Sequence, residues 1–200
     1  MILVMPMFIS PMLPEHTQNP FADDSYIFEP KMAGHRLILS RDAKETRLWT
    51  RHMEECTRQY PELHHVPIEG DDLVLDGEVC CINPDTGHLE SGLVMERLQL
   101  KKKKRIDAFA ARRPVHYAVW DILFYKGRDL RSLPLVKRRS ILESALETND
   151  HFITVPQTDG SADRLIVTLK DKAIEGIVAK KKDSPYVSRR SHDWLKIAID

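Results

Sequence analysis

Residues 29–36 read EPKMAGHR and run directly into the apolar residues 37–39. The lysine of this stretch, Lys31, lies two residues after Glu29 and is followed by a glycine and an arginine. This order predicts a loop that enters a β-strand and presents a lysine amine. An ordinary lysine amine is protonated at neutral pH, so it becomes a nucleophile only where desolvation or neighbouring cations favour loss of the proton.

Three further motifs follow this stretch along the chain. Residues 76–78 read DGE, residues 175–180 read EGIVAK, and residues 194–196 read WLK. The first motif lies within the apolar run 73–82, where two carboxylates would be costly to bury without a purpose. Each motif is short, but the occurrence of four of them in order indicates that they serve one site.

Together the four motifs resemble the adenylation (nucleotidyltransferase) domain of ATP-dependent DNA ligases of the small bacterial or phage type. The resemblance implies that Lys31 attacks the α-phosphate of ATP, expels pyrophosphate and forms a lysyl-AMP phosphoramidate. AMP would then pass to the 5′-phosphate of a DNA nick, and the 3′-hydroxyl would displace it. It also implies a cytoplasmic monomer, not bound to a membrane, that acts on nicked duplex DNA in repair, recombination or replication.

The same resemblance assigns roles to side chains around Lys31. It implies ATP binding by Glu29, Arg36, Arg51, Glu78, Trp120, Lys180 and Lys196, and binding of Mg²⁺ (or Mn²⁺) by Glu78 and Glu175. Two carboxylates are adequate for Mg²⁺, which usually keeps several waters. Arg36 and Arg51 would hold the ribose and phosphates, and Glu29 would meet the adenine amino group through its backbone.

Trp120 stands where the family commonly has Phe or Tyr stacked on adenine, and an indole offers a larger face. The residues themselves leave other interpretations open. Trp120 is equally compatible with a place in the core, and Arg36 and Arg51 with ordinary surface positions. The glutamates of the DGE and EGIVAK motifs are also compatible with strand ends or with arginine pairs.

Two positions depart from the family pattern. Ala33 replaces the usual aspartate beside the lysine, and Ala198 replaces a second lysine after Lys196. The aspartate would have a positional role, and misplacement by one ångström can cost a factor on the order of a hundred in rate. Loss of a phosphate-facing cation weakens stabilisation of transition-state charge. A nucleotide- or nick-binding module without turnover therefore stays an alternative, as does an RNA ligase or a capping-type guanylyltransferase.

The composition is that of a globular protein of 200 residues, 42% hydrophobic and 30% charged. Thirty basic and thirty acidic residues cancel, so nucleic acid can be attracted only by a local patch. For the basic run 101–105 a solvated loop is favoured over a site for duplex phosphates, and for Lys181, Lys182, Arg189 and Arg190 surface and phosphate-binding roles are equally open. Three cysteines, an odd number, suit a reducing compartment. The sequence contains no P-loop, dinucleotide-binding or serine-hydrolase motif.

Apolar patterning predicts an α+β fold with largely antiparallel sheets. The predicted strands are 26–28, 36–40, 46–50, 73–82, 115–123, 152–155, 177–179 and 194–199, and the predicted helices are 54–60, 93–100, 134–146 and 161–174. The apolar segment 1–13 is interrupted by prolines and is expected to pack onto the body of the domain. No apolar run is long enough to span a bilayer.

The resemblance implies that the sheets form the walls of a nucleotide pocket, as in ligase adenylation (ATP-grasp-like) domains, and that residues 1–200 form this single domain. Cellular relatives continue into an OB-fold domain, which is absent from this sequence. We therefore expect either an isolated catalytic domain or part of a longer protein.

Overall fold

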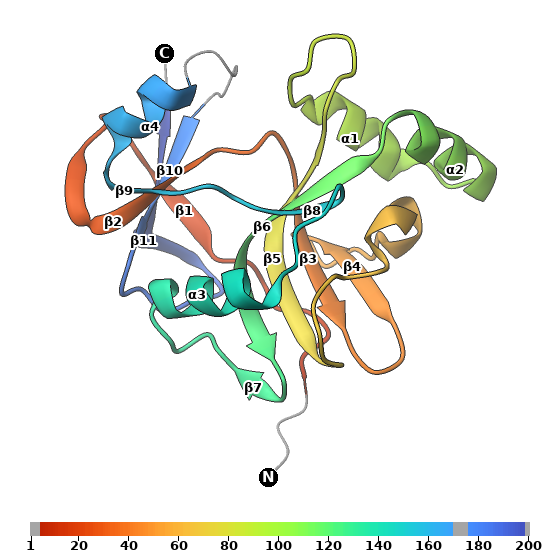
Figure 1. Cartoon of the computed structure of the whole chain (residues 1–200), viewed down its shortest axis with the longest axis horizontal. Helices are drawn as coiled ribbons and strands as arrows, with labels where there is room; N and C mark the ends of the chain where they lie inside the picture. Colours follow the sequence, from red (N-terminus) through yellow and green to blue (C-terminus); the bar gives the residue numbers. More distant parts are fainter. Residues whose placement is uncertain (1–4, 170–175, 199–200) are drawn as a thin grey trace.

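Two β-sheets, packed side by side with helices at their outer faces, form the computed structural model, which describes residues 5–169 and 176–198 (Figure 1). The first sheet has the strand order β1-β11-β10-β2-β9. Its strands are β1 (Leu13–Thr17), β2 (Ala22–Pro30), β9 (Thr158–Ser161), β10 (Gly176–Lys181) and β11 (Arg190–Ala198). Only the β1–β11 pair is parallel in this sheet.

The second sheet has the order β4-β3-β5-β6-β7, with β8 added beside β6 in parallel. Its strands are β3 (Gly34–Arg41), β4 (Thr46–Thr50), β5 (Leu73–Cys81), β6 (Val115–Tyr125), β7 (Arg128–Asp129) and β8 (Phe152–Thr154). The prediction of an α+β fold with two mainly antiparallel sheets is confirmed.

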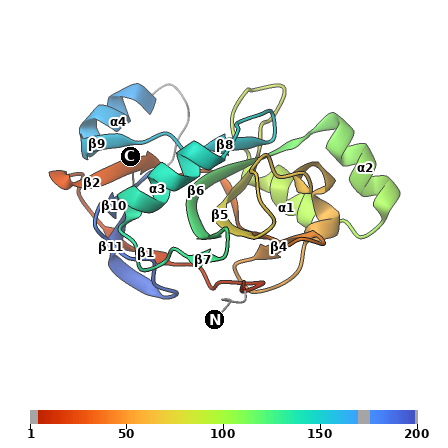
Figure 2. The same cartoon turned by 60° about the horizontal axis from the view of Figure 1, so that its bottom comes forward.

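Within residues 5–169 and 176–198, four α-helices cover these sheets (Figures 1 and 2). They are α1 (Ser91–Gln99), α2 (Lys103–Arg112), α3 (Leu135–Ala145) and α4 (Ala162–Leu169), and short 3₁₀ turns form at Thr57–Gln59 and Pro61–Leu63. The main core lies between the second sheet and α1, α2 and α3, whereas α4 packs on the first sheet through Ala162 and Leu165. No helix in the described part of the chain is long and apolar enough to cross a membrane.

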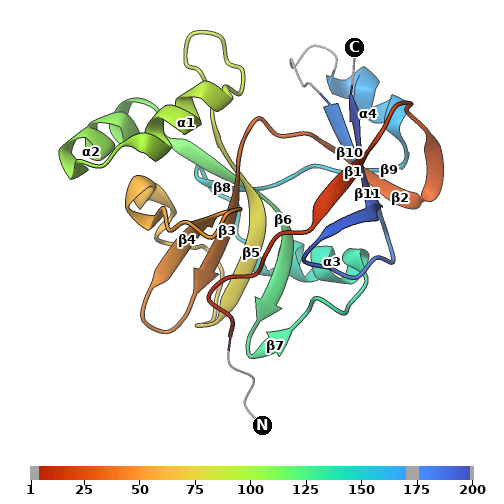
Figure 3. The ribbon, with the colours of Figure 1, turned by 180° about the vertical axis from the view of Figure 1, so that it is seen from behind.

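The N-terminal segment packs on the body of the domain, as predicted for its described residues. Ile9 and Met12 are buried in a cluster with Ile38 of β3, Phe124 of β6 and Trp194 of β11. This cluster joins the two sheets on the side away from α1, and Figure 3, seen from behind, shows the segment crossing in front of the second sheet before it enters β1.

Two predictions of local structure were wrong. The predicted helix 54–60 is instead a loop with one 3₁₀ turn, because its backbone pairs with β4: the Thr50 N–H donates to the Glu54 carbonyl and the Cys56 N–H to the Leu48 carbonyl. The basic run 101–105 is not all loop, since α2 begins at Lys103. The helix packs because Ile106, which is buried, and Phe109, which packs against the main core, fall on one face.

The last predicted helix is confirmed only in its first half. Helix α4 ends at Leu169, and residues 170–175 lie outside the described part of the chain. Ser161, the first residue of the predicted helix, is instead the final residue of β9 and directly precedes α4. Strand β1, which the sequence analysis missed, extends the first sheet beside β11.

Candidate nucleotide-binding site

Lys31 lies in the short link 31–33 that carries the chain from the first sheet to the second. The backbone N–H of Lys31 donates to the carbonyl of Gly176 at 2.8 Å, which fixes the start of the link against β10. The link ends at Gly34, where β3 approaches β5 so closely that a Cβ atom would overlap the carbonyl oxygen of Val79. The glycine of the lysine motif is therefore required by strand packing.

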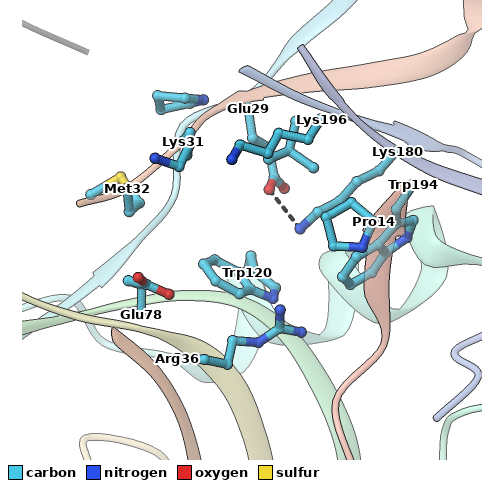
Figure 4. Close-up of a pocket in the computed structure, with 12 residues that line it drawn as sticks. Pro14, Glu29, Lys31, Met32, Arg36, Glu78, Trp120, Lys180, Trp194 and Lys196 are labelled. Carbon is cyan, nitrogen blue, oxygen red and sulfur yellow. Dashed lines mark ion pairs between the residues drawn. The ribbon is translucent and has the colours of Figure 1, made fainter. Parts of the chain in front are cut away.

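One face of the first sheet supplies half of the walls of a cavity beside Lys31. The strand register sets Glu29 of β2 opposite Val178 of β10, and Lys180 of β10 opposite Trp194 of β11. Because side chains alternate along strands, Lys196 lies on the same face as Trp194. All five side chains line the cavity (Figure 4).

The second sheet supplies the opposite wall. Arg36 of β3 pairs with Glu78 of β5, and Trp120 projects from the neighbouring strand β6. Figure 4 shows Trp120, Arg36 and Glu78 across the cavity from Glu29 and Lys196. The cavity has a volume of about 150 Å³ and shares Arg36 and Glu78 with an adjoining groove of about 540 Å³.

A buried chain of charges runs through the first wall. The Glu29 carboxylate contacts Lys180 Nζ through Oε2 and Arg139 Nη1 through Oε1, both at 2.6 Å. Arg139 comes from α3 and also donates to the carbonyls of Trp120 and Val155. Burial lowers the pKa of Lys180, although Glu29 opposes this effect. The pair thus keeps an ammonium group at the cavity wall in a largely desolvated setting.

Arg36 is held by a second buried carboxylate. Its guanidinium makes two 2.5 Å contacts with Asp76 and donates to the carbonyl of Met12 at 2.9 Å. Asp76 also accepts from the hydroxyl of Tyr186 at 2.7 Å. Burial disfavours the cation, but Asp76 and Tyr186 outweigh that penalty and raise the pKa of Arg36. The first carboxylate of the DGE motif therefore positions an arginine rather than lining the cavity.

Trp120 combines the two interpretations that the sequence left open. It packs against core clusters, yet its ring lines the cavity. The Arg36 guanidinium carbon and Lys180 Nζ each lie 4.7 Å from its ring centroid. The indole is thus oriented by two cations, and its ring contributes a flat apolar surface to the cavity wall.

Glu78 is the carboxylate of the second wall. Burial raises the pKa of Glu78 to about 7, although Arg36, Lys31 and Arg51 act in the opposite direction. A carboxylate that remains undercompensated by three nearby cations suits a further cation, and Mg²⁺ accepts few protein carboxylates when phosphate oxygens and waters complete its shell. Glu78 therefore fits the predicted metal role; Glu175, the other predicted ligand, lies outside the described residues.

The structure brings most of the predicted site together. Lys31, Glu29, Arg36, Glu78, Trp120, Lys180 and Lys196 all line one cavity. Arg51 does not: it is exposed, donates to His52, and lines the adjoining groove. Ala198 pairs with Gly176, which places it on the cavity face of β11 beyond Lys196. The roles of these residues stay predictions.

Sequence reasoning did not assign every residue that lines or supports the cavity. Trp194 was found only as part of a motif, although its spacing of two from Lys196 predicts a shared strand face. Pro14 and Met32 also line the cavity, and Arg139 supports Glu29 from α3. No local signal identifies Pro14 or Arg139, because each reaches the site from a distant part of the chain.

A fold of two sheets that share a lysine-bearing cavity defines a nucleotidyltransferase-like domain, and comparison with known proteins specifies the family. The family sequence model described as ATP dependent DNA ligase domain matches residues 6–198 of this chain. The chain therefore belongs to the ATP-dependent DNA ligase family.

Named relatives agree with this assignment. The chain is 37% identical over 192 residues to the SPbeta prophage-derived DNA ligase-like protein LigB of Bacillus subtilis, which covers 96% of this chain and 67% of that protein. A probable DNA ligase of Streptomyces avermitilis is 31% identical over 178 residues, or 84% of this chain and 34% of that protein. The chain thus spans only about a third of the length of such larger relatives.

Solved structures show the same fold. A mycobacterial DNA ligase D complexed with ATP and MES superposes with a TM-score of 0.75 at 23% identity, over 94% of this chain and 60% of that chain. The ATP-dependent DNA ligase from bacteriophage T7, in complex with ATP, gives a TM-score of 0.63 at 14% identity, over 94% of this chain and 68% of that chain.

Proposed function

We propose that this chain performs the nucleotide-transfer step of an ATP-dependent DNA ligase. Lys31 Nζ attacks the α-phosphorus of ATP and forms a phosphorus–nitrogen bond. The bond between the α-phosphorus and the oxygen that bridges to the β-phosphate breaks, so that pyrophosphate leaves and AMP stays bonded to Lys31. AMP then passes to the 5′-phosphate of a nick in duplex DNA, and the 3′-hydroxyl displaces it to close the strand. Such sealing would serve DNA repair, recombination or replication.

The convergence of Lys31, Lys180, Lys196 and Glu78 on one cavity carries the proposal. Trp120 offers a flat face for adenine, and the carbonyl of Glu29 offers an acceptor for its amino group. The lysines face the place where phosphate charge develops, which is how preorganised cations stabilise phosphoryl transfer. Glu78 and, by resemblance, Glu175 would hold Mg²⁺, which neutralises phosphate charge when it is bound.

The proposal is tested by intact-mass measurement after incubation with ATP and Mg²⁺. We expect a gain of one AMP on the unaltered chain and none on Lys31→Ala, with Lys137→Ala, at an exposed position of α3, as the matched lysine control. An adduct that persists in Lys31→Ala would contradict the assignment of the nucleophile. GTP in place of ATP separates a ligase from a capping-type guanylyltransferase.

A second candidate function rests on Ala33 and Ala198. The first removes a carboxylate beside Lys31, and the second removes a cation from the cavity face of β11. With both absent, the domain would bind ATP or a nick without turnover. Noncovalent ATP binding without the mass gain would favour this alternative.

A further inference from the structure

The segment 100–113 holds an uneven share of the charge of the molecule. It contains seven basic residues and one acidic residue, a formal charge of +6, in a chain whose total is zero. The remaining residues therefore carry a formal charge of −6. Such asymmetry concentrates a positive potential over one small region, which global charge does not reveal.

Helix α2 presents this charge to solvent. Ile106 is buried and Phe109 packs on the main core, so the opposite face of the helix points outward. Residues 101–105 are all exposed, and Asp107 neutralises only Lys103, at 2.6 Å. Ala108 and Ala111 are also exposed. Because their side chains are small, a binding partner can approach the helix closely between the basic residues.

The start of α2 contradicts the usual placement of charge on a helix. Its first turn carries Lys103, Lys104 and Arg105 and no acidic residue, and Lys102 provides no side-chain cap. Cations near the positive end of a helix dipole are unfavourable, because the unpaired N–H groups there already carry partial positive charge. A sequence that breaks a local rule in this way commonly does so for function.

An arginine-lined groove adjoins the basic face. It lies between α1 and α2, has a volume of about 310 Å³, and is lined by Arg105, Arg112 and Arg113 beside Phe109. The Arg113 guanidinium lies 6.0 Å from the Phe109 ring centroid. Glu96 is the single carboxylate among the residues that line it.

A groove links the nucleotide cavity to α1, the helix that precedes this basic surface. The groove that shares Glu78 with the cavity extends to Met95 and Leu98 of α1, and α2 follows α1 along the chain. Figures 1 and 3 show α1 and α2 at the same end of the second sheet as the β2–β3 link that carries Lys31. A long anion could therefore contact α2 and reach Lys31.

We propose that residues 101–105 with Arg112 and Arg113, here called the α2 basic surface, bind the phosphate backbone of duplex DNA and hold it beside the cavity. The inference rests on the proposed function, since a nick must lie at Lys31. Several exposed cations without base-reading polar groups suit sequence-independent phosphate contacts. Phosphates at α2 also offset the unfavourable charge of its first turn.

The test compares two variants that each lose three lysines and one arginine. The first carries Lys101→Ala, Lys102→Ala, Lys104→Ala and Arg105→Ala. The control carries Lys44→Ala, Lys126→Ala, Lys137→Ala and Arg128→Ala, which are exposed and lie on the β3–β4 turn, the β6–β7 turn, α3 and β7. Binding of a nicked duplex is measured by fluorescence anisotropy between about 50 and 200 mM salt, the range over which phosphate contacts are lost.

We expect the first variant to bind at least about tenfold more weakly at low salt, and its slope of log K against log salt to fall by about 2 to 4, since each phosphate contact contributes about 0.9. The control should change the slope by less than about one. Equal slopes in the two variants, or no binding by the unaltered chain at low salt, would overturn the proposal.

Lysyl-AMP formation and thermal melting complete the design. Both variants should form the adduct as the unaltered chain does, because the first step needs no DNA. Absence of the adduct in all three proteins would refute the proposed function while leaving the binding comparison decisive. The first variant should melt no lower than the unaltered chain, because it removes unfavourable charge from the start of α2.

Discussion

Glu78 makes the stability of the folded protein depend on pH. Its pKa in the folded protein is raised to about 7, above the value of about 4.5 for an exposed glutamate. The unfolded chain therefore loses the proton first, and the contribution of Glu78 to stability is present below about pH 4.5 and lost as pH rises through 7. We predict that Glu78→Gln is more stable than the unaltered chain at pH 8, by about 1–3 kcal/mol after discounting for solvent screening.

Melting curves at pH 8 and pH 5 measure this difference. The gain of Glu78→Gln should be about 3–8 °C at pH 8 and should shrink greatly at pH 5. Glu69→Gln, at an exposed position, serves as the control and should melt like the unaltered chain at both pH values. A gain of equal size at the two pH values would mean that packing rather than charge burial causes it.

Ala33 is the position at which a single substitution is expected to change the reaction rate most clearly. It lies in the link between Lys31 and Gly34, where a carboxylate would restore the family pattern. We predict that Ala33→Asp speeds lysyl-AMP formation or nick sealing by about 10- to 100-fold, because small errors in position have costs of this order. Single-turnover labelling with ATP and sealing of a nicked duplex, with any missing domain supplied, measure the two steps. Ala33→Asn is the control, and an unchanged rate would contradict the positional role.

At the scale of elements, the approach of β3 to β5 explains the glycine of the lysine motif. A Cβ atom at Gly34 would overlap the Val79 carbonyl oxygen, so Gly34→Ala must push the two strands apart. We predict a loss of about 2 kcal/mol or more in the free energy of unfolding, since overpacking typically costs about 1–3 kcal/mol and here meets backbone. Gly92→Ala in α1 meets nothing closer than 3.9 Å and should stabilise by up to about 1 kcal/mol.

Urea unfolding of the two alanine variants distinguishes these effects. Similar midpoints for Gly34→Ala and the unaltered chain would show that β3 and β5 separate at little cost. The comparison is informative because the two substitutions add the same methyl group, once between strands and once on an exposed helix turn.

The elements also show what the sequence could and could not predict. Strand alternation could have placed Lys196 with Trp194 on one face of β11, because the two residues are two positions apart. The pairing of Arg36 with Glu78 depends on which strands are neighbours, which the sequence analysis did not predict. The buried pair of Arg138 and Asp121, at 2.8 Å, was not predictable, because it joins α3 to β6 through tertiary packing alone. The predicted helix 54–60 was wrong because pairing with β4 overrode local helical spacing. In each case the missing information concerned which distant segments meet.

At the scale of the whole molecule, the cavity is a junction between two sheets that otherwise meet through the link 31–33, the N-terminal cluster and α3. Arg139 ties α3 to β2 through Glu29, and the Leu135 N–H donates to the Ser184 carbonyl between β10 and β11 at 3.0 Å. A ligand that contacts Lys180 on one sheet and Trp120 on the other adds a further connection. Its binding free energy should therefore appear as resistance to unfolding of the whole domain.

We predict that ATP with Mg²⁺, at about 100 times its dissociation constant, stabilises Lys31→Ala by about 2.7 kcal/mol, which corresponds to a rise of about 5–11 °C in melting temperature. The rise should vanish when ATP is removed by gel filtration, because this variant binds only reversibly. The unaltered chain should keep part of the rise after the same step, since covalent AMP cannot dissociate. If the two proteins behave alike after filtration, Lys31 does not hold AMP; if neither is stabilised, the cavity between the sheets does not bind ATP.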